Sequence, residues 1–215
     1  YRWAFVNINV RPFYADGSRT LGYEVAEQLG WKSPAHTVVP AASGAMFTKI
    51  WKGFNEFADL GLIPPVKTRM HLVQARGCSP IASAYLEGRM VIKPVKANSI
   101  AKSLAIGNPA DGYYALKAIE ASEGSAVITE ESEVAQGIRL LAETEGIFTE
   151  AAGGVAIYGL KHLVETGQIQ PDESTVVYIT GNGLKTTEVI ADTINPLNIV
   201  PTVESFEEAL TAKIG

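Results

Sequence analysis

The sequence predicts an α/β fold in which a mostly parallel sheet is flanked by helices in three layers. Two observations support this prediction. Short apolar runs alternate with segments of helical period along the chain, and no internal repeat or low-complexity stretch interrupts them. The apolar run at residues 176–179 also lacks the alternation of a half-exposed strand, as expected of a parallel strand that helices cover on both faces.

The first half of the chain contributes two strands and two helices to this prediction. We expect strands at residues 4–9 and 36–40. Between them, residues 17–30 place leucine and valine at four-residue spacing before a terminal glycine, a pattern that predicts a helix. A longer helix is expected from about Met46, because five large residues form one wide apolar face at helical spacing. These are Phe47, Ile50, Trp51, Phe54 and Phe57.

The rest of the chain continues the alternation. Strands are expected at residues 66–74 and 126–128, in addition to the run at 176–179. Helices are expected at residues 109–121 and from about residue 151. The apolar side of the latter helix is expected to consist of Ala156, Leu160, Leu163 and Val164.

A further helix is expected after Thr129. This threonine is the expected N-cap, because Glu130 and Glu131 then lie in the first turn, where carboxylates interact favourably with the helix dipole. The inner face of this helix is expected to consist of Val134, Ile138 and Leu141.

The composition favours a soluble globular protein. A chain of 215 residues with 47% hydrophobic side chains can bury a sizeable core. The net charge of -5 arises from scattered acidic and basic residues without a basic stripe, so nucleic acid is not an expected partner. Because no apolar run approaches about 18 residues, we expect no membrane span.

Cys78 is the single cysteine of the chain. It cannot build a disulfide framework or a cysteine-cluster metal site, so we expect no metal and a cytoplasmic location. The first residue is Tyr1 and strand-like sequence begins within a few positions, which suggests that the chain is part of a longer protein.

Two loops are candidates for ligand binding. Residues 180–183, Thr-Gly-Asn-Gly, follow an expected parallel strand, and ligands of open parallel sheets bind at the carboxyl ends of strands. The alternative is that the two glycines only permit positive backbone dihedrals in a tight turn. Residues 41–45 are small and precede the helix expected from Met46, so free backbone amides at its start could bind a phosphate. The alternative there is an ordinary loop with Ser43 as N-cap.

Several blocks resemble one enzyme family. They are "FVNINVRPFYADGSRTLGYEVAEQLGW", "VVPAASGAMFTKI", "QARGCSPI", "SIAKSLAIGNPADGYYAL", "LLAETEGIFTEAAGGVA" and "ITGNGLKT". In this order they resemble the C-terminal half of threonine synthase, a pyridoxal-phosphate enzyme of fold type II, from about residue 3 to about residue 190. The resemblance implies that residues 1–215 form mostly the large domain, with residues 1–10 at the end of the small domain.

The resemblance implies pyridoxal 5'-phosphate as cofactor. Thr180 would bond the pyridine nitrogen through its hydroxyl, and Glu150 lies in a segment that lines the cofactor site in relatives. A neutral hydroxyl makes the ring a milder electron sink than an aspartate would, which suits elimination and replacement chemistry. A carboxylate at a helix start is the alternative explanation of Glu150. The implied phosphate cradle is Ala42, Ser43, Gly44, Ala45 and Met46, although Ser43 and Met46 stand where asparagines are common in relatives.

The implied reaction converts O-phospho-L-homoserine and water to L-threonine and phosphate. Candidate residues for this phosphorylated amino-acid substrate are Asn9, Arg11, Ser18 and Lys102. At the position of an arginine that many relatives use for this substrate, the present chain has Tyr14. The resemblance leaves a homodimer open as the assembly.

The resemblance places the Schiff-base lysine upstream of this chain. Lys185 belongs to the Gly-Leu-Lys block and not to the imine site, so we expect no catalytic residue in this chain and an inactive isolated chain. Two alternatives stay open. One is a sister enzyme on the same scaffold, such as a cysteate synthase or a threonine dehydratase-like lyase. The other is a non-catalytic domain that binds a phosphorylated ligand or pairs with another subunit.

Overall fold

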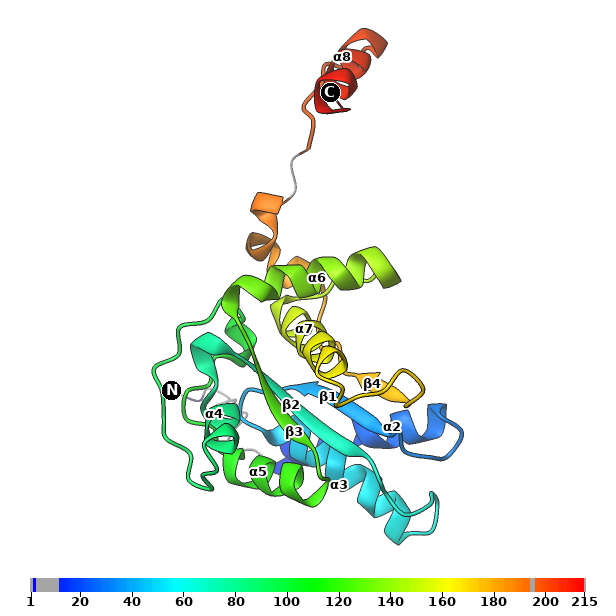
Figure 1. The fold of residues 1–215 in the computed structure, drawn as a ribbon, viewed down its shortest axis with the longest axis vertical. Coiled ribbons are helices and arrows are strands. Elements are labelled where there is room, and N and C mark those ends of the chain that lie inside the picture. The colour runs from blue at the N-terminus through cyan, green and yellow to red at the C-terminus, as the bar shows by residue number, and fades with distance from the viewer. Residues whose placement is uncertain (1, 3–11, 194–195, 215) are drawn as a thin grey trace.

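The computed structural model describes residues 2, 12–193 and 196–214 (Figure 1). The strand expected at residues 4–9 lies outside them. The described part is an α/β structure in which helices cover both faces of a parallel sheet. This confirms the predicted fold class.

Within the described residues, the sheet has four parallel strands in the order β3-β2-β1-β4. In the register of the sheet, His36 of β1 lies opposite Arg69 of β2 and Thr175 of β4. The strands are β1 His36–Pro40, β2 Arg69–Ala75, β3 Ser125–Thr129 and β4 Thr175–Val177. Each matches an expected strand, and the carboxyl ends of all four face the same edge because the strands are parallel.

Two groups of helices make the outer layers. Side chains of α2 to α5 pack against one face of the sheet around Met70 and Leu72, and α6 and α7 pack against the other face around Val38 and Val73. The helices are α1 Pro12–Gly17, α2 Thr20–Gln28, α3 Ala45–Asp59, α4 Pro80–Leu86, α5 Gly112–Ala121, α6 Glu131–Glu145, α7 Ala151–Glu165 and α8 Val203–Ile214. Of these, α1, α4 and α8 were not expected from the sequence.

The expected cap of α6 is wrong. Glu130 is the N-cap, and it forms a reciprocal capping box with Glu133. Thr129 still belongs to β3, and its hydroxyl donates to the Val155 carbonyl at 3.1 Å, which ties the strand to α7. The threonine therefore stabilises the packing of two elements instead of a helix start.

Val164, which the sequence places on the apolar side of α7, is 45% exposed, because it lines an open apolar hollow between α6, α7 and β4. One expectation of burial needs correction. Val176 and Val177 are half-buried, because β4 is the last strand in the sheet order and, among the described residues, pairs with β1 alone. The uniform apolar run therefore marks a strand at the edge of the sheet that the described residues form.

The chain after the sheet leads away from it. Three short 3₁₀ turns, Gly183–Lys185, Thr187–Val189 and Ala191–Thr193, precede α8, which stands apart from the layers in Figure 1. No helix of the described residues is long and apolar enough to cross a membrane.

Candidate functional site

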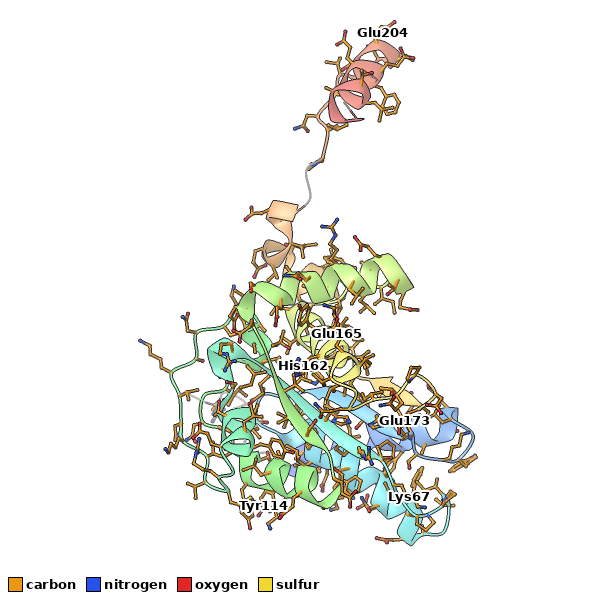
Figure 2. The ribbon with its side chains drawn as sticks, in the orientation of Figure 1. Lys67, Tyr114, His162, Glu165, Glu173 and Glu204 are labelled. Atoms are coloured by element: carbon orange, nitrogen blue, oxygen red, sulfur yellow. The ribbon has the colours of Figure 1, made fainter. Side chains whose placement is uncertain are left out.

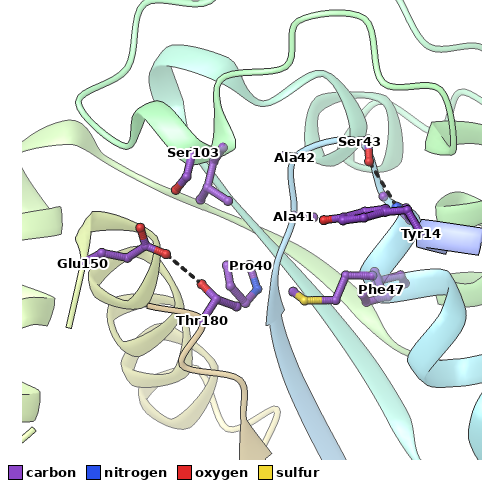
Figure 3. Close-up of a pocket in the computed structure, with 13 residues that line it drawn as sticks. Tyr14, Pro40, Ala41, Ala42, Ser43, Phe47, Ser103, Glu150 and Thr180 are labelled. Atoms are coloured by element: carbon purple, nitrogen blue, oxygen red, sulfur yellow. Dashed lines mark hydrogen bonds between the residues drawn. The ribbon is translucent and has the colours of Figure 1, made fainter. Parts of the chain in front are cut away.

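A pocket of about 190 Å³ opens at the carboxyl ends of β1 and β4 (Figure 3). Its walls come from distant parts of the sequence: the β1–α3 loop, the start of α7 and the segment after β4. The lining residues are Tyr14, Pro40, Ala41, Ala42, Ser43, Gly44, Ala45, Met46, Phe47, Ser103, Leu104, Glu150 and Thr180.

The loop between β1 and α3 forms one wall. Gly44 is the N-cap of α3 with a φ of 90°, a conformation that favours glycine. A Cβ atom there would lie 3.1 Å from the Asp111 carbonyl oxygen and 3.2 Å from Ala115 Cβ. The Ser43 hydroxyl accepts from the Ala45 amide at 3.4 Å. The first amides of a helix lack intrahelical partners, so this wall presents hydrogen-bond donors to the pocket.

The opposite wall carries a buried carboxylate. Glu150 precedes α7 and is 3% exposed. The Thr180 hydroxyl donates to Glu150 Oε1 at 3.2 Å, as Figure 3 shows. On its other side, Glu150 Oε2 lies 2.6 Å from Lys185 Nζ, whose side chain is 59% exposed. A line of three polar groups thus runs from the pocket to the surface.

Gly181 and Gly183 serve close packing. A Cβ atom on Gly181 would lie 2.5 Å from Glu150 Oε1, and one on Gly183 would lie 2.4 Å from the Phe148 ring. Neither glycine has a positive φ, so the expectation that they permit positive dihedrals is wrong. They are small because Glu150 and Phe148 occupy the space that side chains would take.

Backbone pairing holds these two segments together. The Glu150 amide donates to the Gly181 carbonyl at 3.0 Å, and the Gly183 amide donates to the Phe148 carbonyl at 3.0 Å. Between these bonds, Thr149 and Asn182 form an antiparallel bridge. Asn182, to which the sequence assigned no role, accepts from the Leu184 amide at 2.9 Å and caps the following turn. The position of Glu150 relative to Thr180 is therefore fixed by the main chain.

The pocket contains all seven residues that the resemblance assigns to the cofactor, but neither of the two substrate candidates that the structure describes. Asn9 and Arg11 lie outside the described residues. The Ser18 hydroxyl donates to the Tyr14 carbonyl at 3.3 Å, and Lys102 is 75% exposed and pairs with Glu188 at 3.1 Å. Neither Ser18 nor Lys102 is among the described residues that line the pocket.

Two pocket residues that carry a hydroxyl group were not proposed from the sequence as site residues. Tyr14 was noted only as a replacement of an arginine, and Ser103 follows Lys102 within a quoted block. Ser103 could have been found by moving the candidate in the "SIAKSLAIGNP" block from Lys102 to the next residue. Neighbouring side chains of a short turn point in different directions, and here Ser103 lines the pocket.

A second buried polar cluster lies at the amino ends of the strands. His36 Nδ1 and His71 Nε2 share a hydrogen bond of 2.9 Å, and His71 Nδ1 lies 2.7 Å from Ser125 Oγ. Glu173, labelled in Figure 2 in the turn before β4, places Oε2 3.0 Å from His36 Nε2. Burial, with the nearby His36 and Arg69, lowers the pKa of His71 to about 4. This histidine is therefore neutral near pH 7.

The fold and the pocket define a class of protein. The family model for pyridoxal-phosphate dependent enzymes matches residues 1–181, and the chain belongs to this family. Its similarity to particular members is also clear. It is 39% identical over 178 residues to threonine synthase of Methanocaldococcus jannaschii, covering 82% of this chain and 44% of that protein. With threonine synthase of Methanosarcina acetivorans it is 33% identical over 207 residues, 95% of this chain and 51% of that protein.

A solved structure agrees in fold. Threonine synthase from Escherichia coli superposes with a TM-score of 0.67 at 17% identity, covering 94% of this chain and 45% of that chain. This chain therefore has the fold of type II pyridoxal-phosphate enzymes. It spans about half the length of the curated relatives that it matches.

The residues of the pocket fit the family's cofactor. The wall formed by the β1–α3 loop offers backbone amides and the Ser43 hydroxyl, which are suitable donors for a phosphate monoester. The Thr180 hydroxyl, on the opposite wall, is suitable for a ring nitrogen. The apolar side chains of Met46 and Leu104 complete a lining that a flat ring can contact.

Proposed function

We propose that this chain forms the phosphate cradle and the ring-nitrogen partner of a pyridoxal-phosphate enzyme whose complete form is a threonine synthase. The complete enzyme would convert O-phospho-L-homoserine and water to L-threonine and phosphate. The observation that carries the proposal is the pocket in which the β1–α3 loop and Thr180 meet, although they lie about 140 positions apart in the sequence. The chain around this pocket is similar to threonine synthases over most of its length.

The residues of the chain act by binding and orienting. The amides at the start of α3 and the Ser43 hydroxyl bind the phosphate of the cofactor, and the Gly44 backbone lets that group approach closely. Thr180 fixes the edge of the ring. When bound, the cofactor would supply the electron sink that proton removal from the substrate and departure of its phosphate need.

The imine lysine is proposed to come from the remainder of the protein. Among the described residues that line the pocket there is no lysine, and Lys185 is paired with Glu150 on the far side of that carboxylate. The 215-residue chain by itself is therefore expected to bind the cofactor weakly and to turn over no substrate. The phosphate of the substrate is proposed to bind Arg11 and Asn9, and Ser18 and Lys102 stay candidates for the same role.

Cofactor binding is tested with analogues that need no lysine. We expect the isolated chain to bind 4-deoxypyridoxine 5'-phosphate saturably in isothermal titration calorimetry. The unphosphorylated analogue 4-deoxypyridoxine should bind at least about tenfold more weakly, because it leaves the α3 amides without an anion. Equal affinity for the two analogues would contradict the phosphate cradle.

The reaction is tested in two constructions. The isolated chain mixed with pyridoxal 5'-phosphate should show no imine absorbance and release no phosphate from phosphohomoserine. A chimaera, in which the chain replaces the matching stretch of the M. jannaschii threonine synthase, should form threonine. A panel with other phosphorylated and hydroxylated amino acids separates threonine synthase from a sister lyase. Turnover by the isolated chain would refute the assignment of the imine lysine to the remainder.

A further inference from the structure

We propose that a second hollow, between α3 and α5, binds a phosphorylated amino acid. This α3–α5 hollow has a volume of about 550 Å³, and among the described residues it shares none with the pocket at the carboxyl ends of β1 and β4. Its lining residues are Thr48, Lys49, Trp51, Lys52, Asp111, Tyr114, Lys117, Ala118 and Ala121. The site goes beyond the proposed function, because it lies elsewhere in the molecule and needs no cofactor.

Two helices bring three cationic side chains to the α3–α5 hollow. Lys49 and Lys52 lie about one turn apart on α3, and Lys117 lies on α5, about one turn after Tyr114, which is labelled in Figure 2. Among the described residues that line the hollow, Asp111 is the one carboxylate beside these three lysines. The lining therefore has a net positive charge, which favours an anionic ligand.

The three ammonium groups keep donors for a ligand. An ammonium has three hydrogens, and each of these lysines pairs with a single described carboxylate, which does not line the hollow. The pairs are Lys49–Asp16 at 3.3 Å, Lys52–Glu56 at 3.7 Å and Lys117–Glu120 at 3.1 Å. The Lys52 pair is the longest, and Glu56 is already bonded by Arg19 at 2.6 Å and by Tyr23. Lys52 is therefore the lysine that is most readily engaged by a ligand.

Asp111 supplies the opposite charge at the same hollow. It occupies the N-cap position of α5, yet its side chain makes no capping hydrogen bond. Burial raises the pKa of its carboxyl group, and the nearby Lys49 opposes this shift. The Asp111 amide donates to the Ser43 carbonyl at 3.0 Å, so the residue is held behind the β1–α3 loop. A ligand ammonium beside this carboxylate would offset the cost of its burial.

A phosphorylated amino acid carries the matching set of charges. Near pH 7 a phosphate monoester has about two negative charges, and the α-carboxylate and α-ammonium groups have one charge each. The lysines can bond to the phosphate and the carboxylate, and Asp111 can accept from the ammonium. The carbon chain between these groups can contact Trp51 and Ala118, which line the same hollow. Inorganic phosphate, by contrast, would leave Asp111 without a cation.

The lysines are tested by isothermal titration calorimetry of the 215-residue chain with O-phospho-L-homoserine. The titration is done at low ionic strength, where charge pairing is screened least. We expect saturable binding, and a loss of affinity of at least about tenfold when Lys52→Met and Lys117→Met are combined. Lys161→Met is the matched control, because Lys161 is similarly exposed and, like Lys52, pairs with a glutamate four residues later on its own helix. It should leave the affinity unchanged.

Asp111→Asn tests the recognition of the amino group. The second ligand is 4-phosphonooxybutanoate, which is phosphohomoserine without its α-ammonium group. Asp111→Asn should weaken the binding of phosphohomoserine by about tenfold and should not weaken that of the butanoate. Damage to the fold would weaken both ligands alike, so the difference between them reports the contact with the ammonium. An equal loss for both ligands would contradict the assignment of Asp111.

The remaining outcomes separate this site from the proposed function. Thr180→Val should leave the binding of phosphohomoserine unchanged, because Thr180 lines the other pocket. Loss of binding in Thr180→Val but not in the lysine double variant would locate the ligand in that pocket and overturn the α3–α5 site. Absence of binding to the unmodified chain would overturn it as well. If the chain binds phosphohomoserine as expected but not 4-deoxypyridoxine 5'-phosphate, the proposed function fails and the α3–α5 site stands.

Discussion

The two ends of the sheet carry buried polar groups that differ in one respect. At the amino ends, His36, His71, Ser125 and Glu173 bond to one another in a continuous chain. At the carboxyl ends, the first turn of α3 and Thr180 face a cavity. A buried polar cluster that satisfies itself contributes to stability and specificity of packing, whereas donors and acceptors directed into a cavity provide for a ligand. The comparison thus separates a structural cluster from a binding site on the same strands.

Acidification should affect the amino-end cluster most. The pKa of His71 is about 4 in the folded chain and near 6.5 when unfolded, so its neutral form stabilises the fold fully above pH 6.5. This contribution is lost as pH falls from 6.5 toward 4, by about 3 kcal/mol in total. Urea unfolding at a series of pH values measures the slope of the unfolding free energy against pH. Besides burial, the charged groups that act on the pKa of His71 are His36, Arg69 and Glu173.

Two variants sharpen this prediction. His71→Gln should remove most of the slope between pH 6.5 and 5, where few carboxylates titrate. His162→Gln is the matched control, because His162 is exposed on α7 and should leave the slope intact. An unchanged slope in His71→Gln would show that the amino-end cluster does not couple stability to pH.

At the carboxyl end, Gly44→Ala should weaken both the site and the fold. The new Cβ would press on Asp111 and Ala115 and strain the positive φ, with a stability loss of about 2 kcal/mol and a loss of analogue affinity above about tenfold. Gly61→Ala is the control, since it has a φ of 71° and its Cβ meets no described atom within 4 Å. Calorimetric binding and thermal unfolding of both variants give the measurement. Equal affinity in the two would exclude a role of the loop in phosphate binding.

Ser43→Ala should have the smallest effect. Loss of one hydroxyl among several backbone donors lowers the affinity for 4-deoxypyridoxine 5'-phosphate by about 1 kcal/mol, roughly fivefold, while unfolding changes little. Ser132→Ala on the exposed side of α6 serves as control. A loss confined to the phosphorylated analogue would assign the hydroxyl to the phosphate; an equal loss for both analogues would assign it to the ring.

Local patterns predicted most of the fold. The strand at residues 36–40 was found with its exact bounds, because an apolar run between a proline loop and small residues has few other interpretations. α4 was missed because a helix of seven residues that begins at Pro80 is too short to show a helical period. Thr129 was misassigned because a strand end and a helix cap favour the same residue type.

The site was predictable in its parts but not in its pairings. The small residues of the β1–α3 loop and the strand-end Thr180 could be read from local sequence and family resemblance. The contact between Glu150 and Thr180 joins positions 30 apart, and no local pattern encodes it. The same holds for His36 and His71, which become neighbours only through strand register. Their roles therefore depend on tertiary structure.

The β1–β4 pairing has a consequence for how the gene tolerates change. Among the described residues, the ladder between β4 and β1 has three residue pairs, and they set the distance between the two pocket walls. Codons added to the exposed turn before Thr175 would lengthen a surface loop and leave the walls in place. Loss of a single codon between Val177 and Thr180 would displace the threonine by about 3.3 Å. A displacement of this size would break the hydrogen bonds of its hydroxyl. Length variation among natural homologues should accordingly concentrate before this strand and be nearly absent after it.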